Sequence, residues 1–292
     1  MVDMFLIIIF WLISIALTGV TYYFSGLYAH WYWIWTIPLF LYAYFLVVFA
    51  SWILFLFIGS LFVKEDEEYI YQPNRFAQWT VKSTCRVICF LLGMRVHVSG
   101  LGKIPSHTPV MIINNHLSVF DEIAMAAFYP GHIVFVSKPG NFHIPIGGSW
   151  MRYAGYLPIK QGDMTNGKKV IALAADYISK KRINVCIAPE GTRNKKFPNP
   201  QILPFHPGSF AMAYEAKCPI AVFAIQNTNF VWSRFPLRAT HVYCDCVGVL
   251  EYDEYASLTP QELANKTQGM IKARFEKKEA RFYHKKIEPE DE

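Results

Sequence analysis

Asp, Glu, Lys and Arg are almost missing from the first fifth of this chain, where Asp3 is the single exception. From Met4 to Val63, sixty consecutive residues include no Asp, Glu, Lys or Arg. Over all 292 residues only 17% are charged, whereas 53% are apolar and 16% are aromatic. This balance excludes a disordered chain and a basic nucleic-acid-binding protein, so we expect no nucleic-acid partner.

Cysteine is also sparse, and the sequence contains no Walker loop, dinucleotide fingerprint or sustained heptad repeat. Spacings between the cysteines match no zinc site, and most lie in apolar runs. We therefore interpret them as reduced, buried residues of a cytosolic domain. The six are Cys85, Cys89, Cys186, Cys218, Cys244 and Cys246.

The uncharged segment predicts two membrane crossings, because a bilayer core of about 30 Å needs roughly 20 apolar helical residues. We place them near Met4–Phe24 and Ile34–Phe62, with an aromatic cluster at the turn between them. Residues 1–63 would then form a transmembrane helical hairpin. The basic residues after it, from Lys64 to Arg86, predict that both of its ends face the cytosol.

Residues 64–92 predict a linker and an amphipathic helix with an apolar majority and a basic minority. This helix fits either the membrane interface or ordinary packing against the domain. The remaining residues, 93–292, have the usual size of one cytosolic domain.

Short β-rich runs alternate with helical stretches after residue 93, a pattern typical of βαβ units. The fold class is therefore α/β, with a mainly parallel sheet flanked by helices. Expected strands are 95–98, 110–113, 133–136, 156–159, 183–188, 220–225 and 241–247. Expected helices are 119–128, 167–181, 208–217 and one that opens with a capping box at Thr259 and Glu262 and runs to Arg281.

The first candidate site is the run after the second strand, where His116 and Asp121 stand five residues apart. On one regular helix the two side chains would point apart. They can meet only if His116 lies in the turn before the helix and Asp121 in its first turn, with Ser118 as the N-cap. Asp121 would then orient a histidine base, or it would only complete a capping box.

The second candidate site is the turn after the fifth strand, Pro189-Glu190-Gly191-Thr192-Arg193. Proline ends the strand, glycine permits a positive φ, and arginine offers a planar fork suited to phosphate. An ordinary basic surface turn is the alternative. Sites of open α/β sheets gather at the carboxyl ends of strands, which favours function at both places.

Together, these two motifs resemble those of the glycerolipid acyltransferases, whose best-known members are the 1-acylglycerol-3-phosphate (lysophosphatidic acid) acyltransferases. Two intermediate features also match: the block from Lys138 to Gly155 and the run opened by Cys218-Pro219-Ile220. The resemblance covers about 110–225, with four motifs in the family's order.

The resemblance implies that His116 is a general base oriented by Asp121. It implies that Glu190, Gly191, Thr192 and Arg193 bind the acceptor, with Lys138 as a further cationic contact. It also implies transfer of an acyl group from an acyl-CoA or acyl carrier protein thioester to 1-acylglycerol-3-phosphate, which makes phosphatidic acid. No bound cofactor or metal is implied, and Ser118 is better explained by capping than as a nucleophile.

At one position that bears on the choice of acceptor, this sequence differs from the family's motif pattern. Where many members carry an acidic-arginine pair, this chain has Ile159-Lys160-Gln161. Another lysophospholipid or glycerol-3-phosphate therefore stays open as the acceptor.

Two other classes are a metal-dependent membrane hydrolase that uses His116 and Asp121 together with His143 or His206, and an inactive lipid-binding protein. The expected location is the endoplasmic reticulum membrane in a eukaryote or the inner membrane in a bacterium, with a membrane bilayer as partner.

Overall fold

The computed structural model describes residues 5–31, 33–63, 72–199 and 201–276. The start of the predicted linker at residue 64 and the predicted end of the last helix at Arg281 lie outside these residues.

Contacts within the chain divide it into two compact units. We call Met1–Ile88 with Pro139–Tyr156 the hairpin unit, and Cys89–Lys138 with Leu157–Glu292 the sheet unit. Each unit is described by itself.

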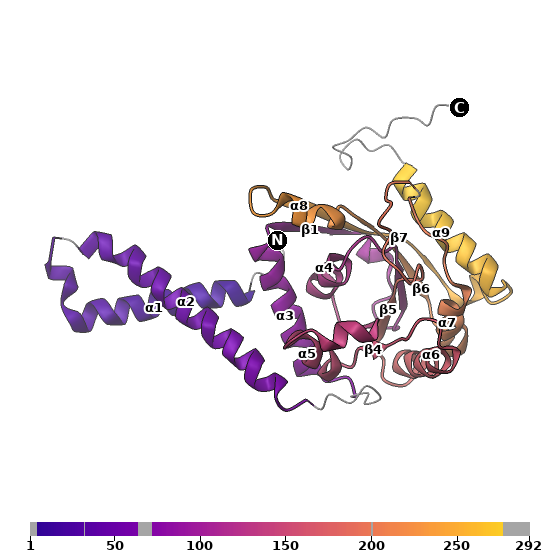
Figure 1. The fold of residues 1–292 in the computed structure, drawn as a ribbon, viewed down its shortest axis with the longest axis horizontal. Coiled ribbons are helices and arrows are strands. Elements are labelled where there is room, and N and C mark those ends of the chain that lie inside the picture. The colour runs from indigo at the N-terminus through magenta and orange to yellow at the C-terminus, as the bar shows by residue number, and fades with distance from the viewer. Residues whose placement is uncertain (1–4, 32, 64–71, 200, 277–292) are drawn as a thin grey trace. The chain divides into compact units, whose positions relative to one another are not determined.

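Two long apolar helices begin the hairpin unit (Figure 1). They are α1 (Phe5–Ser25) and α2 (Trp33–Ser60), joined through a short 3-10 turn, η1 (Leu27–Ala29). Each helix is long enough and apolar enough to cross a bilayer. The two helices predicted from the uncharged segment are therefore present.

Side chains along α1 and α2 pair in antiparallel order. The hydroxyl groups of Thr21 and Tyr44 lie 2.5 Å apart near the turn. Further from the turn, the rings of Trp11 and Phe45 stack with centroids 4.7 Å apart. These contacts form a helical hairpin whose outer surface is covered with large apolar side chains.

The rest of the hairpin unit packs around Trp150. The helix α3 (Arg75–Leu91) begins in this unit, and α5 (Gly147–Tyr153) follows a 3-10 segment, η3 (Pro139–His143). The indole of Trp150 donates to the Leu56 carbonyl of α2 at 2.8 Å. The sequence did not predict α5, because two glycines begin it and glycine disfavours helices.

The sheet unit contains seven strands in the order β1-β7-β6-β2-β5-β3-β4. All neighbouring pairs are parallel except β6 and β7, so the predicted mainly parallel α/β sheet is confirmed. The central strands are apolar and wholly buried, as expected for strands covered on both faces. The strands are β1 (Met94–Ser99), β2 (Met111–Asn114), β3 (Ile133–Ser137), β4 (Leu157–Pro158), β5 (Asn184–Ile187), β6 (Ile220–Gln226) and β7 (Thr240–Leu250).

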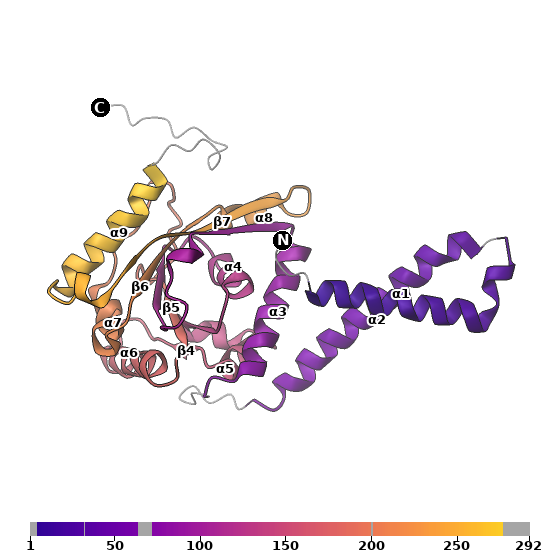
Figure 2. The same cartoon turned by 180° about the vertical axis from the view of Figure 1, so that it is seen from behind.

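Helices cover both faces of the sheet (Figures 1 and 2). The helix α4 lies on one face, and α6, α7 and α9 lie on the other. Their bounds are α4 (Phe120–Phe128), α6 (Met164–Ser179), α7 (Ala211–Ala216) and α9 (Pro260–Glu276), and a short α8 (Val231–Arg234) follows β6.

Several boundaries differ from the sequence-based expectations. The helix α6 begins at Met164, earlier than predicted, because the Asp163 side chain caps it by accepting the Asn166 N–H at 2.9 Å. The predicted helix 208–217 is split into a 3-10 segment, η4 (Pro207–Phe210), and the short α7. The capping box that opens α9 is confirmed.

A methyl group at Gly59 tests the packing of the hairpin unit. A Cβ there would lie 2.4 Å from Cζ2 of Trp150, whereas a Cβ at Gly19 of α1 would have no neighbour within 4 Å. We expect Gly59→Ala to lower the unfolding free energy by about 1–3 kcal/mol, because the buried indole must move. The matched Gly19→Ala should be neutral or slightly stabilising. Denaturant unfolding in detergent micelles measures both, and equal stability would contradict the packing of Trp150 against α2.

Candidate active site

The candidate site of the sheet unit lies at the carboxyl ends of the parallel strands β2, β5 and β6. His116 occupies the turn after β2, and Asp121 lies in the first turn of α4. The segment that begins at Pro189 follows β5, and Thr228 follows β6. Open α/β sheets place their ligand sites at this edge.

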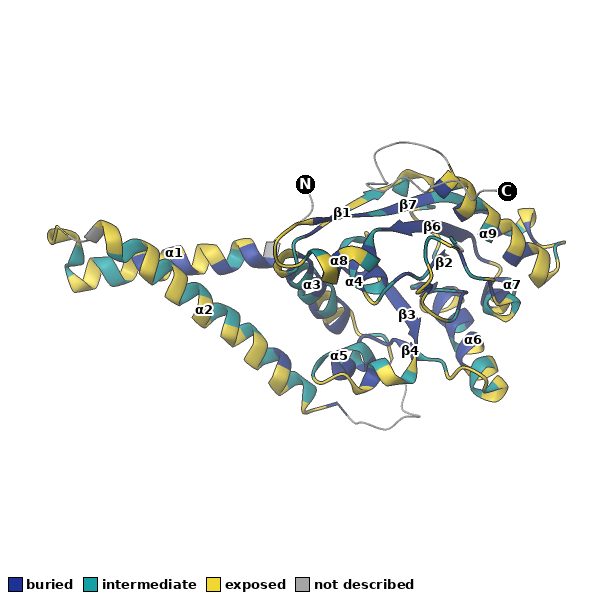
Figure 3. Ribbon diagram, turned by 45° about the horizontal axis from the view of Figure 1, so that its top comes forward, coloured by how far each residue is buried: buried dark blue, intermediate teal, exposed yellow. Residues whose placement is uncertain are grey.

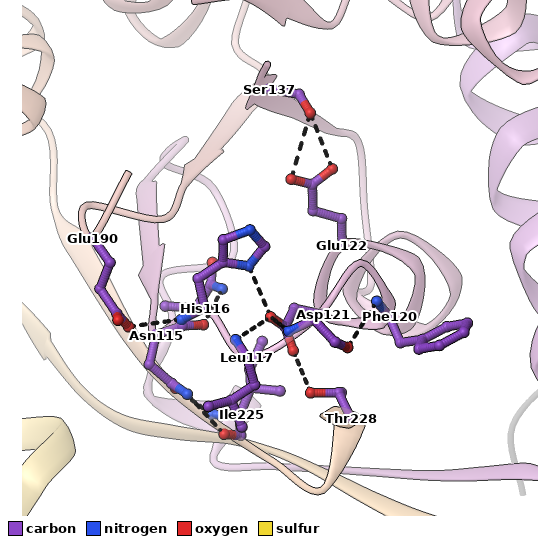
Figure 4. A network of polar contacts seen from close by, with 12 residues as sticks. Asn115, His116, Leu117, Phe120, Asp121, Glu122, Ser137, Glu190, Ile225 and Thr228 are labelled. Atoms are coloured by element: carbon purple, nitrogen blue, oxygen red, sulfur yellow. Dashed lines mark hydrogen bonds and ion pairs between the residues drawn. The ribbon is translucent and has the colours of Figure 1, made fainter. Parts of the chain in front are cut away.

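His116 and Asp121 are in direct contact, with His116 in the turn before α4 and Asp121 in the first turn of the helix, as predicted (Figure 4). The His116 Nδ1 lies 2.9 Å from Asp121 Oδ2. Asp121 is fully buried, while the side chain of His116 is 14% exposed to solvent. Because Nδ1 donates to the carboxylate, Nε2 is the nitrogen that can accept a proton. This is the geometry of a histidine base held in one tautomer.

The capping box that the sequence offered as an alternative does not form, because the N-cap of α4 is Val119, which has no side-chain cap hydrogen bond. Asp121 instead binds the turn before the helix. Its Oδ2 accepts the N–H groups of Leu117 at 2.7 Å and Ser118 at 2.9 Å. The helix begins one residue later than an N-cap at Ser118 requires, because Val119 occupies the cap position. The Ser118 hydroxyl instead accepts the Phe120 N–H at 3.1 Å. Orienting the histidine and shaping the turn are therefore two results of one carboxylate.

The electrostatic surroundings of His116 favour the imidazolium. Burial alone lowers the pKa of His116, but the hydrogen bond and charge of Asp121 raise it. The nearby carboxyl groups of Glu122 and Glu190 raise it further, and the net result is a pKa above the ordinary value. The imidazole is therefore a stronger base than a free histidine.

Glu190 ties the second motif to the first. Its Oε1 accepts the His116 N–H at 2.8 Å, and its Oε2 accepts the Leu203 N–H at 3.1 Å. The Asn194 N–H in turn donates to the His116 carbonyl at 2.7 Å. The backbone of His116 is thus held on both sides by the segment after β5, and Figure 4 shows Glu190 and Asp121 reaching it from different directions.

Glu190 is 2% exposed, and burial raises its pKa to about 7, although the N–H groups of His116 and Leu203 oppose the shift. Gly191 makes the turn that follows, with φ +63 and an N–H donated to the Ala188 carbonyl at 3.0 Å. The Glu190 carboxyl therefore accepts hydrogen bonds from two backbone N–H groups. After the turn at Gly191, the chain returns to the surface at Thr192.

Three predicted binding residues differ from the others in their surroundings. Thr192, Arg193 and Lys138 are exposed. Within the described part of the chain, no side-chain hydrogen bond joins them to the His116 network. Arg193 stands one residue from Asn194, which contacts His116, whereas Lys138 follows the end of β3. The structure thus brings the base, its carboxylate and the Glu190 turn together and leaves the cationic side chains in solvent.

Gln161 contacts the turn at the position where the resemblance departs from the family pattern. Its side-chain amide donates to the Gly191 carbonyl. A Cβ at Gly191 would lie 3.0 Å from Gln161 Nε2 and 3.1 Å from Cδ2 of His206. Gln161 and His206 therefore flank the turn closely, and both are exposed.

Further residues of the network were missed by the sequence reasoning. The Asn115 side chain forms two hydrogen bonds with Ile225 of β6, accepting its N–H at 2.7 Å and donating to its carbonyl at 2.9 Å. The Thr228 hydroxyl donates to Asp121 Oδ1. Asn115 stands beside the predicted base, which was a usable signal. Thr228 is 107 residues from Asp121 in the chain, and nothing local marks it.

Glu122 is a further missed member. Its carboxyl lies 3.3 Å from the Ser137 hydroxyl, and burial raises its pKa, with the Asp121 charge adding to the effect. A carboxyl group with a raised pKa beside a histidine is a feature common at functional sites, so Glu122 joins the candidate residues.

The contact of His116 with Asp121 has the geometry expected of a general base and its orienting carboxylate. Among the described residues, no three His, Cys, Asp or Glu side chains gather as metal ligands would. The geometry therefore supports proton abstraction from a hydroxyl and gives no support to the metal-dependent hydrolase.

Comparison with protein families identifies the class. Residues 95–226 match the family model described as Acyltransferase. This segment contains β1 to β6, His116, Asp121 and the whole Glu190 turn. This segment is therefore similar to acyltransferase domains, in agreement with the order of the motifs.

Relatives within this class carry a more specific name. The match to 1-acyl-sn-glycerol-3-phosphate acyltransferase alpha of Homo sapiens is 28% identical over 176 residues, 60% of this chain and 61% of the relative. The sheep relative of that name is also 28% identical and is covered over 60% of its length. The 1-acyl-sn-glycerol-3-phosphate acyltransferase of Salmonella typhimurium is 26% identical over 174 residues and is covered over 70%. The matched region therefore spans about 60% of the mammalian relatives.

A solved structure shares the fold. The 1-acyl-sn-glycerophosphate acyltransferase PlsC from Thermotoga maritima matches with a TM-score of 0.57 at 18% identity, over 93% of this chain and 95% of that one. This likeness concerns the fold.

The raised pKa of His116 can be tested directly. We expect Asp121→Asn to lower this pKa, because it removes the charge and weakens the hydrogen-bond acceptor that raise it. The amide can keep the backbone contacts through its oxygen and can donate to Thr228. Titration of 13C-labelled imidazoles by NMR in detergent measures the change, with Glu122→Gln as a control of smaller effect. An unchanged His116 pKa in Asp121→Asn would contradict the pairing.

Proposed function

We propose that the protein is an O-acyltransferase that transfers an acyl group from an acyl thioester to the free hydroxyl of 1-acylglycerol-3-phosphate and so makes phosphatidic acid. The contact between His116 Nδ1 and the buried Asp121 carboxylate carries the proposal. A match to the Acyltransferase family model and relatives named for this acceptor support the reaction class.

In the proposed reaction, Nε2 of His116 takes the proton of the acceptor hydroxyl as its oxygen attacks the thioester carbonyl. The tetrahedral intermediate expels the thiolate, which receives the same proton from the imidazolium. Asp121 stabilises the imidazolium between these steps and keeps the proton-accepting nitrogen turned to the substrate. No enzyme nucleophile is needed, since the acceptor supplies it.

The acceptor phosphate requires charge-assisted donors, and the exposed cations beside the base can supply them. Arg193 follows the Gly191 turn and can bind phosphate with its planar fork, and Lys138 at the end of β3 offers a second charge. We propose that the turn from Glu190 to Arg193 holds the acceptor, with Glu190 acting through the backbone of His116.

Gln161 is the observation that keeps a second acceptor open. Its amide donates to the Gly191 carbonyl, and it carries no charge where many members have an arginine. Another lysophospholipid or glycerol-3-phosphate would demand a different arrangement of cations. A panel of these acceptors with one acyl-CoA distinguishes them.

The location proposed for the reaction is a membrane surface. The two apolar helices can anchor the chain in the bilayer where lipid acceptors reside. We propose that residues 93–292 form the catalytic part on the cytosolic face, with acyl-CoA or acyl carrier protein as the thioester carrier.

Removal of the base tests the mechanism. We expect His116→Ala to lower kcat for thiol release from acyl-CoA by roughly 100- to 10,000-fold, the usual contribution of a general base. The matched control is His107→Ala, because His107 is exposed in the loop before β2. Retention of full activity by His116→Ala in detergent, with the control also active, would remove this histidine from the mechanism.

Removal of the cation tests the acceptor site. We expect Arg193→Met to raise the KM for the lysophosphatidic acid acceptor by roughly 10- to 100-fold and to leave that for acyl-CoA nearly unchanged. Lys195→Met is the control, since Lys195 is an exposed cation two residues away. A rise in the KM for acyl-CoA alone would contradict the proposal that Arg193 binds the acceptor phosphate.

A further inference from the structure

Large apolar side chains cluster in solvent on the segment that follows β6. We call this cluster the α8 patch, and Figure 3 shows exposed residues on α8, which are Trp232 and Ser233. Leu237 is 91% exposed and Trp232 is 65% exposed, values unusual for residues of this size. The exposed apolar members are Val119, Phe230, Trp232, Phe235 and Leu237.

The α8 patch is an ordered surface. The ring of Trp232 packs edge-on against the buried Phe120, with centroids 5.3 Å apart. Phe235 packs against the other side of the cluster, 6.5 Å from the Trp232 ring. The Phe235 N–H also donates to the Val231 carbonyl at 3.1 Å. The aromatic side chains are therefore presented outward on a fixed backbone.

The charged residues of the segment that carries α8 are all basic. Between Glu215 and Asp245 the sequence contains no acidic residue. Arg234 stacks over the ring of Phe230 at 5.2 Å, and Arg238 is exposed beside Leu237. Aromatic and basic side chains in one surface are the composition that favours the interface of an anionic membrane.

The α8 patch is connected to the candidate base. Thr228, three residues before Val231, donates to Asp121, and Phe120 precedes Asp121 in the chain. A ligand that covers the patch would therefore lie at the same edge of the sheet as His116.

We propose that the α8 patch docks on the headgroup layer of an anionic bilayer and so places the His116 edge of the sheet unit against the lipid surface. A bilayer is favoured over a protein partner because the same chain carries two helices that can cross a membrane, and because the arginines complement anionic lipids. The inference deepens the proposed function and rests on it only for the identity of the acceptor.

Site-specific fluorescence in the full chain tests the contact. Leu237→Cys is labelled with an environment-sensitive dye in vesicles of equal amounts of phosphatidylcholine and phosphatidylglycerol. The six native cysteines are buried and compete little for the reagent. The matched control is Ser257→Cys, because Ser257 is also exposed. Ser257 follows β7, whose last residue Leu250 pairs with Ile220 at the amino end of β6. The α8 patch, in contrast, follows the carboxyl end of β6.

At position 237 we expect quenching by spin-labelled lipid to be several-fold stronger than at position 257. Quenching by aqueous acrylamide should be several-fold weaker. Replacing phosphatidylglycerol with phosphatidylcholine should reduce the difference, because the arginines lose their counter-charges. Equal acrylamide access at both positions would overturn the proposal, as would shielding of position 237 from both quenchers, which would show a protein covering the patch.

A kinetic measurement connects the contact to the substrate. We expect Leu237→Ser/Arg238→Gln to lower the rate with a long-chain acceptor embedded in vesicles by roughly fivefold. The rate with a water-soluble short-chain acceptor should be unchanged, since neither side chain touches the base. Equal loss on both acceptors would contradict the docking role. Absence of acyl transfer in the native chain, with lipid quenching intact, would overturn the proposed function and leave the membrane contact standing.

Discussion

One buried carboxylate organises the candidate site. Asp121 accepts hydrogen bonds from His116 Nδ1, from the N–H groups of Leu117 and Ser118, and from the Thr228 hydroxyl. A charge with no exposure is costly unless donors surround it, and here four donors from two segments, the turn after β2 and the turn after β6, do so. The same bonds fix the imidazole tautomer, the turn after β2 and the start of α4.

The backbone of the base is held by the neighbouring strands as well. Glu190 and Asn194 after β5 bind the N–H and carbonyl of His116, and Asn115 binds Ile225 of β6. The ends of β2, β5 and β6 are thus joined through the adjacent residues Asn115 and His116. A base positioned this way needs little reorganisation when its proton-accepting nitrogen meets a substrate, which is the usual advantage of a rigid site.

The sequence predicted the parallel sheet because its central strands are continuous apolar runs, such as Ile220–Ile225, between recognisable turns. It predicted the contact of His116 with Asp121 because their spacing allows only one geometry. It did not predict α5 or α8, which are too short to show a helical period. Thr228 and the Ile225 contact of Asn115 depend on pairings across more than a hundred residues, and no local pattern encodes them.

The buried thiols carry a consequence for the fate of the acyl group. Cys186 of β5 donates to the Asn114 side chain at 3.3 Å, and burial raises its pKa well above the ordinary value. A thiolate in this position would compete for an activated ester and leave the protein acylated on itself. Because the Cys186 sulfur is enclosed in the core, it is not available to take up an acyl group, in agreement with the proposed direct transfer to the acceptor hydroxyl.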